Sequence, residues 1–552
     1  MNGSFIRSID IHDSWEAIRC DQIISPEDGI TVGISGRIFE RRGFGAIGVT
    51  PMSEEAICAL VRGVLRDGGD YLARNAWGAF VLAVHDTSHR RLLLFRDPSG
   101  METVFWRRSP DRVAFSTQLA TLAQDVTPAP ERVVDFIVRG PAASSESLFD
   151  DISELPAGWF VEFSERGERV EPYWLSHKLG ATPMSNDDDL RRLYADVITA
   201  FAGTSTRVLI DLSGGVDSSV LLGMAVRALG HDRVVAATVS YMSIGMELET
   251  KIARNVARHL NVPLIEIDGG DALPFSPTTA ARRLWNRPAQ QQLHVKLHLR
   301  EAELALSSEC GVTLNGLGGD QVFCAMPNVP WHALQKLLQG KICATTSDLR
   351  AFANRTGTPY WQIGKQTAKG LWAIYSDLGF TEPLETPVWL LRDFQPSAAR
   401  VKADLPVSPL RRTQALEVVQ ATRQTDCGYR GVPLVHPYLT QPIQEFASTL
   451  AAADMVVNDL DRFALRRAMR SMVPSEAIDR RWKSEYSGIY QQGVRVNAAR
   501  VRSLLLDGWL VSQKLVNRDA LRSVVSRIAQ GDRLDLVPFL NAVAFEMWIQ
   551  QD

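Results

Sequence analysis

A seven-residue loop with two glycines and three serines has the composition of a phosphate-binding turn. It reads Ser213-Gly214-Gly215-Val216-Asp217-Ser218-Ser219 and follows the apolar run 207–212. Adjacent glycines let the backbone turn tightly and approach a ligand closely. A helix that begins here would offer unpaired N–H groups and a partial positive charge to an anion, and the serine hydroxyls add further donors. The loop lacks the Gly-Lys-Ser/Thr of a kinase-type P-loop. The pattern predicts a cradle for phosphate.

Asp217 is the acidic member of this loop. A carboxylate beside a polyphosphate is repelled unless a cation lies between them, and Mg²⁺ prefers one or two carboxylates together with phosphate oxygens. The loop therefore predicts a magnesium ion with Asp217 as a ligand. The alternative is a plain strand-to-helix turn in which Asp217 is a first-turn acid favoured by the helix dipole.

The segment around this loop alternates strands and helices. Strands are expected at 207–212, 234–240 and 263–267, and helices at 220–229 and 249–260. This order predicts right-handed βαβ units and a parallel sheet with helices on both faces. Ligands of such sheets bind beyond the carboxyl ends of the strands, where the loop lies. Beyond residue 330 the chain is expected to be mostly helical.

The first third of the chain is instead rich in β-formers. Runs at 78–84 and 91–95, with a polar turn between them, predict a hairpin, and 113–116 predicts a further strand. Pro156-Ala157-Gly158 introduces a last hairpin that ends near residue 174. The polar stretch 185–189 follows, so we place one domain at 1–180 and a second at 181–552.

Composition excludes several classes of protein. The 552 residues carry a net charge of −3, so no basic field favours nucleic acid, and no apolar stretch is long enough to span a membrane. The N-terminal residues lack the pattern of a signal peptide. The six cysteines form no C-x-x-C pair, which argues against a disulfide framework or a cysteine zinc site and favours a cytoplasmic protein.

The loop at 213–219 resembles the pyrophosphatase loop of the N-type ATP pyrophosphatase superfamily, and other motifs narrow the resemblance to the asparagine synthetase family. Gly316-Leu317-Gly318-Gly319-Asp320 resembles that family's second glycine-rich motif. Residues 96–100 resemble the Arg-Asp-x-x-Gly turn of its N-terminal glutaminase domain, and 436–439 and 465–487 resemble the C-terminal part of its synthetase domain. The resemblance implies an N-terminal glutaminase-like (Ntn-type) α+β domain, followed by a parallel-sheet α/β domain of the adenine nucleotide α-hydrolase-like type with a helical C-terminal part.

The resemblance also implies roles for single residues. ATP and Mg²⁺ would be bound with Asp217 and Asp320 as metal ligands, and Lys483 would stabilise charge at the reacting carbonyl and the α-phosphate. The residues expected to flank adenine and ribose are Leu212, Val239, Ser240 and Gly316. Ordinary strand-end packing is the alternative for these four, and a surface position is the alternative for Lys483. Glu249 resembles an acid of the family's second helix but equally suits a helix N-terminal charge, and Arg96 and Asp97 are expected to shape a turn.

Two departures from the family pattern bear on the substrate. Members that use glutamine carry a cysteine after the initiator methionine, and here that position is Asn2, which cannot act as a covalent nucleophile. The first domain is therefore expected to be an inactive glutaminase. Leu317 stands where asparagine synthetases have glutamate and β-lactam synthetases have tyrosine, and leucine accepts no proton. An amine nucleophile with a pKa of about 8 needs less help from a base.

Lasso peptide cyclases, also called macrolactam synthetases, fit both departures. The resemblance to them implies that a leader-free core peptide is the substrate, with its Asp or Glu side chain adenylated and its N-terminal amine closing an isopeptide ring. A leader peptidase and a leader-binding protein are the implied partners. The alternatives are a small-molecule amide synthetase of the same family (β-lactam closure or ammonia-using asparagine synthesis) and a catalytically dead scaffold.

Overall fold

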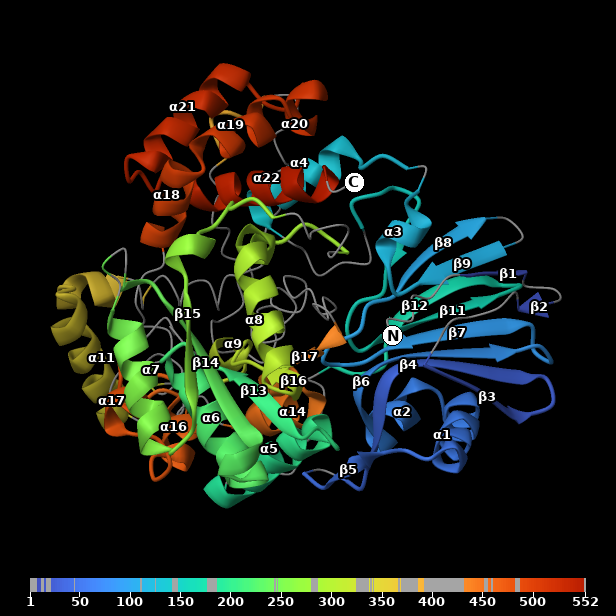
Figure 1. Ribbon diagram of the computed structural model, residues 1–552. Helices are drawn as coiled ribbons and strands as arrows, with labels where there is room; N and C mark the ends of the chain where they lie inside the picture. The colour runs from blue at the N-terminus through green and yellow to red at the C-terminus, as the bar shows by residue number, and fades with distance from the viewer. Residues whose placement is uncertain are drawn as a thin grey trace.

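The architecture is described from a computed structural model (Figure 1). It describes residues 7–10, 14–15, 21–43, 45–109, 112–124, 126–140, 147–175, 186–242, 245, 247–278, 286–323, 337, 340, 342–365, 368, 386–391, 431–450, 455–457, 460–481 and 487–550. A β-rich portion and an α/β portion lie side by side, and a group of helices from the C-terminal third lies above them.

The first portion contains two antiparallel sheets. One sheet has the order β12-β11-β7-β6-β4-β3, with β5 paired to β4, and the other has the order β10-β8-β9-β1-β2. The strands of the larger sheet are β3 (Gln22–Glu27), β4 (Ile30–Arg41), β5 (Ile47–Pro51), β6 (Ala76–Asp86), β7 (Arg91–Arg96), β11 (Trp159–Ser164) and β12 (Gly167–Pro172). Those of the smaller sheet are β1 (Arg7–Asp10), β2 (Ser14–Trp15), β8 (Phe105–Ser109), β9 (Arg112–Ser116) and β10 (Ser153–Glu154). The hairpin predicted at 78–95 is confirmed as β6 and β7, and the strand predicted at 113–116 as β9.

β6 is buried along its whole length because both faces of the larger sheet are covered. Val81 and Ala83 point into a core shared with the smaller sheet, whereas Leu82 and Val84 point into a core shared with helices. This alternation follows from the two-residue period of a strand. The covering helices are α1 (Glu54–Asp67), whose N-cap Ser53 accepts a hydrogen bond from the Ala56 N–H, and α2 (Gly69–Asn75).

The second portion is built on a parallel sheet with the order β15-β14-β13-β16-β17. Its strands are β13 (Arg207–Asp211), β14 (Val234–Ser240), β15 (Leu264–Asp268), β16 (Cys310–Leu314) and β17 (Leu434–Val435). Helices α5 (Asp187–Ala202), α6 (Val216–Leu229) and α7 (Leu248–His259) cover one face, and α8 (Val295–Ser307) covers the other. The parallel sheet with helices on both faces is thus confirmed. The helix expected at 220–229 begins four residues earlier, so half of the phosphate loop is its first turn.

Helices of the C-terminal third complete the molecule and bind the two portions together. They are α14 (Gln441–Thr449), α16 (Phe463–Met469), α17 (Ser475–Ile478), α18 (Ser487–Val496), α19 (Ala498–Leu506), α20 (Trp509–Ser512), α21 (Arg518–Ala529) and α22 (Leu536–Ile549), with α11 (Ile342–Thr356) before them. Glu445 on α14 accepts hydrogen bonds from Arg41 (3.0 Å) and Trp174 (2.9 Å) of the first portion. The side chains of the Arg41–Glu445 ion pair are both nearly fully buried.

Other expectations concern residues outside the described ranges. The domain boundary at 180 lies within 176–185, outside the described residues, and stays a prediction; so does much of the helical region expected beyond 330. Across the described ranges, no helix combines the length and apolarity needed to cross a bilayer.

Candidate functional site

The loop after β13 has the geometry of a phosphate cradle. Gly214 has a φ of +77°, and a Cβ on it would lie 2.4 Å from the Glu249 carbonyl oxygen of α7, so only glycine fits. Gly215 is the N-cap of α6 and supplies no side-chain cap to its first N–H groups. The Ser213 and Ser218 hydroxyls lie 3.0 Å apart and hold the loop closed. The first N–H groups of α6 thus receive no side-chain cap and lie beside the Ser213 and Ser218 hydroxyls, an arrangement that suits an anion.

The second glycine-rich motif packs directly against the first. It follows β16 and begins the short helix α9 (Gly319–Val322). A Cβ on Gly316 would lie 3.0 Å from the Ser218 nitrogen, and one on Gly319 would lie 2.6 Å from the Asp217 Cγ. The glycines thus allow two loops about a hundred residues apart to touch, which brings Asp320 beside Asp217.

A cavity of about 410 Å³ opens between these loops. The predicted site residues that line it are Ser213, Gly215, Asp217, Ser218, Gly316 and Asp320. Leu212, Gly214 and Ser219 do not line it. Leu212 is buried in the core, Ser219 is buried within α6, and Gly214 turns against α7. Val239 and Ser240, at the end of β14, do not line the cavity either, so a position of adenine against them stays a prediction.

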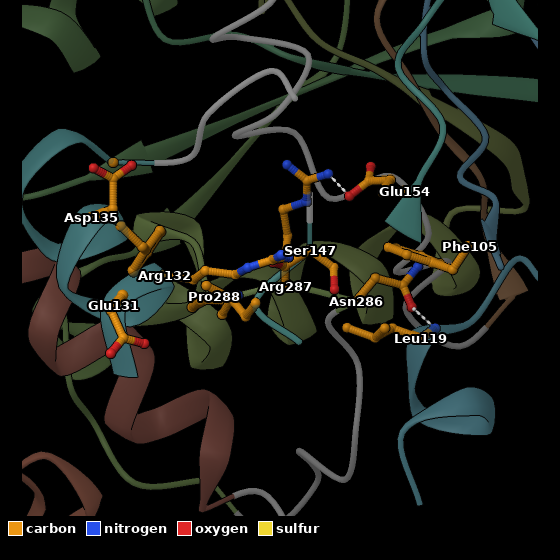
Figure 2. A pocket seen from close by; sticks show the side chains of 13 residues that line it. Phe105, Leu119, Glu131, Arg132, Asp135, Ser147, Glu154, Asn286, Arg287 and Pro288 are labelled. Carbon is orange, nitrogen blue, oxygen red and sulfur yellow. Dashed lines mark hydrogen bonds and ion pairs between the residues drawn. The ribbon is translucent and has the colours of Figure 1, made fainter. Parts of the chain in front are cut away.

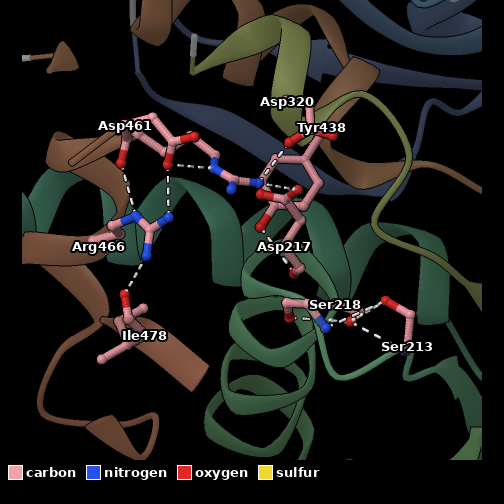
Figure 3. A network of polar contacts seen from close by, with 10 residues as sticks. Ser213, Asp217, Ser218, Asp320, Tyr438, Asp461, Arg466 and Ile478 are labelled. Carbon is pink, nitrogen blue, oxygen red and sulfur yellow. Dashed lines mark hydrogen bonds and ion pairs between the residues drawn. The ribbon is translucent and has the colours of Figure 1, made fainter. Parts of the chain in front are cut away.

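Asp217 and Asp320 converge on one cation, the guanidinium of Arg462. Its Nη1 donates to Asp217 Oδ2 at 2.7 Å and to Asp320 Oδ1 at 2.5 Å, and the two carboxylates face each other in Figure 3. The Arg462 side chain is 11% exposed. Burial by itself lowers the pKa of Arg462, but Asp217, Asp461 and Asp320 together raise it, so the guanidinium stays charged.

Neighbouring residues hold this arrangement in place. Asp461 accepts from Arg462 Nε (3.3 Å) and from Arg466 Nη2 (2.6 Å), and Arg466 also donates to the Ile478 carbonyl (Figure 3). The buried Tyr438 hydroxyl donates to the Asp217 carbonyl at 3.0 Å. Tyr438, Arg466 and Ile478, which lie in segments that resemble the synthetase part, thus hold Asp217 and the Asp461–Arg462 pair in place.

The aspartate pair fits a divalent cation. Two carboxylates that already enclose a positive charge provide the ligands that Mg²⁺ takes from protein when phosphate oxygens complete its shell. Among the described residues no cluster of three or more His, Cys, Asp or Glu side chains is arranged to hold a metal, so the nucleotide would have to supply the remaining ligands. Asp217 and Asp320 are the residues that would hold the ion.

Sequence reasoning missed Arg462, although it opens the basic run that continues at Arg466. It also left Glu249 undecided. That carboxylate pairs with Arg480 through two contacts, at 2.5 and 2.8 Å, and Arg480 lines the cavity. Arg96 and Asp97 shape a turn as expected, because Asp97 accepts from the Glu102 N–H and Arg96 donates to the Gly100 carbonyl.

Two residues with predicted roles are not among those described. Lys483 lies within 482–486 and Asn2 within 1–6. The stabilising role of Lys483 and the loss of glutaminase chemistry at Asn2 therefore stay predictions.

A second cavity, of about 270 Å³, lies where the two portions meet (Figure 2). Arg287 forms an ion pair there with Glu154, which Arg96 also contacts at 2.9 Å. Burial, followed by the charge of Arg96, lowers the pKa of Arg287 to about 9. Asn286 accepts from the Leu119 N–H at 3.0 Å. These contacts join the two portions, and no residue of the two glycine loops lines this cavity.

In comparison with known proteins, the two portions match two different families. Residues 190–550 match the family described as asparagine synthase, and residues 55–174 match the glutamine amidotransferase domain. Asparagine synthetase [glutamine-hydrolyzing] 2 of Bacillus subtilis (strain 168) is 25% identical over 323 residues, which are 53% of this chain and 43% of that protein. The match therefore spans less than half the length of that relative.

A second relative matches over more of its length. The putative asparagine synthetase [glutamine-hydrolyzing] of Mycobacterium tuberculosis (strain ATCC 25618 / H37Rv) is 23% identical over 531 residues, 86% of this chain and 77% of that protein. Among solved structures, an NH3-dependent NAD synthetase from Campylobacter jejuni is 16% identical and covers 34% of this chain and 96% of its own. Its TM-score against this chain is 0.19.

The family match covers well over half of the chain, and the paired glycine loops with their two aspartates lie inside it. The chain belongs to the asparagine synthase family, whose members are ATP-dependent amide-forming ligases.

Proposed function

We propose that this protein uses ATP and Mg²⁺ to activate a carboxylate as an acyl-adenylate and then joins it to an amine. The observation that carries the proposal is the convergence of Asp217 and Asp320, from two glycine loops, on one buried cation at the start of α6. A pair of carboxylates beside a phosphate cradle favours a cation between them and the phosphate, because Mg²⁺ prefers one or two carboxylates together with phosphate oxygens.

Different residues would serve different roles in the adenylation step. The N–H groups at the start of α6, with the Ser213 and Ser218 hydroxyls, would hold phosphate oxygens. Magnesium, held by Asp217 and Asp320, would neutralise charge on the phosphates. The guanidinium groups of Arg462 and Arg480 line the same cavity and add positive charge where pyrophosphate departs. Enclosure between the loops keeps water from the activated carboxyl.

We further propose that the substrate is a leader-free lasso precursor peptide. Its Asp or Glu side chain would be adenylated, and its own N-terminal amine would attack to close an isopeptide ring, releasing AMP and pyrophosphate. Leu317 supports this choice, because it lines the cavity, packs partly against the core and accepts no proton. An α-amine with a pKa of about 8 is partly neutral at physiological pH. It therefore depends less on a proton-accepting side chain at position 317 than an amide nitrogen does. In this proposal the protein acts in the cytoplasm, together with a leader peptidase and a leader-binding protein.

Two assays test the proposed adenylation and the proposed peptide substrate separately. Carboxylate-dependent exchange of pyrophosphate into ATP tests adenylation, and mass spectrometry of a leader-free peptide tests cyclisation, which removes one water and yields AMP. The Asp320→Asn variant serves as a negative control for both. Exchange without ring closure would reject the peptide substrate and keep the ligase, whereas no exchange with any carboxylate would favour a catalytically dead scaffold.

Asparagine synthesis is the second candidate, because the curated relatives described above are named asparagine synthetases. β-Lactam closure belongs to the same class of small-molecule reactions. If aspartate with ammonia or glutamine is turned over and peptides are not, the small-molecule function replaces the macrolactam proposal.

A further inference from the structure

A half-buried titratable group outside the aspartate pair lines the nucleotide cavity. Asp211 is the last residue of β13 and forms part of the cavity wall, together with Leu317. Two residues earlier, Leu209 packs in one core with Leu297 and Ala305 of α8. Alternate residues of a strand share a face, so the Asp211 side chain lies on the face that α8 covers.

α8 carries two titratable groups toward this face. His298 Nδ1 lies 3.0 Å from Glu301 Oε2, and these side chains are 27% and 24% exposed. Burial raises the pKa of Asp211 to about 7; the Glu301 charge adds to this rise and the His298 charge opposes it. Burial lowers the pKa of His298, but Glu301 and Asp211 raise it more. The charges of His298 and Glu301 thus act on Asp211 from the helix that covers its face of the sheet.

Other charges near Asp211 are engaged elsewhere. In the parallel sheet Asp211 pairs with Ala237 of β14. On the other side β16 ends at Leu314, which Asn315 follows, and none of these residues is charged. Within the cavity wall, Arg462 contacts Asp217 and Asp320, and Arg480 contacts Glu249. The carboxylate of Asp211 is therefore the acid of the cavity whose described neighbours are an imidazole and a second carboxylate rather than arginine.

We propose that Asp211 is the proton acceptor for the attacking amine, with His298 and Glu301 as its positioning residues. This inference rests on the proposed amide-forming function and supplies the base that Leu317 lacks. The Asp211 carboxylate takes one proton from the ammonium group, and the freed nitrogen lone pair forms the C–N bond at the acyl carbon. The C–O bond to AMP then breaks, AMP leaves with that electron pair, and the second N–H proton passes to its phosphate.

The decisive experiment separates adenylation from amine attack. The full chain and Asp211→Asn are assayed for pyrophosphate exchange, with the carboxylate that supports exchange in the native chain, and for hydroxamate formation with hydroxylamine, which is already neutral at pH 7. Ring closure through the peptide's own amine is the third readout. We expect Asp211→Asn to keep exchange and hydroxamate formation within about threefold and to lose ring closure by about 100-fold at pH 7, the usual contribution of a general base. The loss should shrink at pH 9, where more of the amine is neutral.

Two further variants exclude a purely structural role. His298→Gln removes a positive neighbour, so the pH profile of ring closure should move to higher pH; Asp211→Glu should restore part of the rate. If exchange and ring closure fall together in Asp211→Asn, the residue serves nucleotide binding or folding and the inference is wrong, as it is if neither falls or if His298→Gln leaves the profile in place. Absence of exchange in the native chain would instead reject the proposed function.

Discussion

Replacement of Arg462 by methionine tests the idea that the aspartate pair is a cation site. The Arg462 side chain is 11% exposed, and its guanidinium contacts Asp217 Oδ2 at 2.7 Å and Asp320 Oδ1 at 2.5 Å. Methionine keeps much of the volume but leaves two carboxylates facing each other. Removal of one partner from a buried ion pair typically costs about 3–5 kcal/mol, because the remaining charge is left uncompensated.

The expected result is a loss of about 3–5 kcal/mol in the unfolding free energy of Arg462→Met in EDTA, and a recovery of most of it in Mg²⁺. The native chain should gain less from Mg²⁺, because its own guanidinium competes for the same two carboxylates. Urea unfolding of both proteins, with and without the ion and without nucleotide, measures the difference. Arg467→Met is the matched control on α16, since Arg467 is 43% exposed in its pair with Asp187 and should contribute only about 0–1 kcal/mol, whatever the metal.

An equal response of both proteins to Mg²⁺ would refute the reasoning, because it would mean that the ion binds elsewhere. A stable, metal-insensitive Arg462→Met would show that the two carboxylates share a proton instead of a cation.

Three further predictions address the site. Asp320→Asn should abolish pyrophosphate exchange, because an amide is a poor substitute for a carboxylate ligand of Mg²⁺; a normal Mg²⁺-dependent rate would count against the assignment. Gly319→Ala should lower exchange at least about tenfold with an unchanged circular dichroism spectrum, because the new Cβ would lie 2.6 Å from the Asp217 Cγ and displace that carboxylate. Its control, Gly364→Ala, adds a Cβ with no atom within 4 Å and should leave exchange unchanged. Lys483→Met should slow amide formation by about 10²–10³-fold without unfolding the chain, as loss of a charge-stabilising contact does; a thermal melt run beside the rate assay checks this.

Contacts between the two portions hold them in one relative arrangement. Glu445 is bound by Arg41 and Trp174, and Glu154 by Arg287 and Arg96, so buried charge pairs cross the interface at two places. Buried pairs need accurate geometry to offset desolvation, which makes them effective at selecting one relative placement. This is the physical reason for a stable arrangement between a β-sandwich and a parallel α/β sheet.

Short-range patterns sufficed for much of this protein. The alternation of strands and helices from 207 to 268, the glycines before α6 and the second glycine motif are local features, set by periodicity and by backbone freedom within a few residues. They predicted the parallel sheet and the loop of Asp217 at its carboxyl edge, which the structure confirms. The place of Asp320 beside Asp217 was instead predicted from the family resemblance. The loop pattern also included Ser219, and the resemblance Leu212, among the nucleotide-binding residues. Both side chains are buried and outside the cavity lining, so their roles stay predictions.

Only the tertiary structure decided which groups complete the site. Arg462 reaches Asp217 across 245 residues and Asp320 across 142, and nothing in its own neighbourhood marks it apart from the other arginines of the run. Asp211 looks like the end of an ordinary strand until α8 is packed over it with His298 and Glu301. Local propensity determines what a segment is, but the charge that faces a given carboxylate depends on how distant segments pack, and that packing is a property of the whole chain.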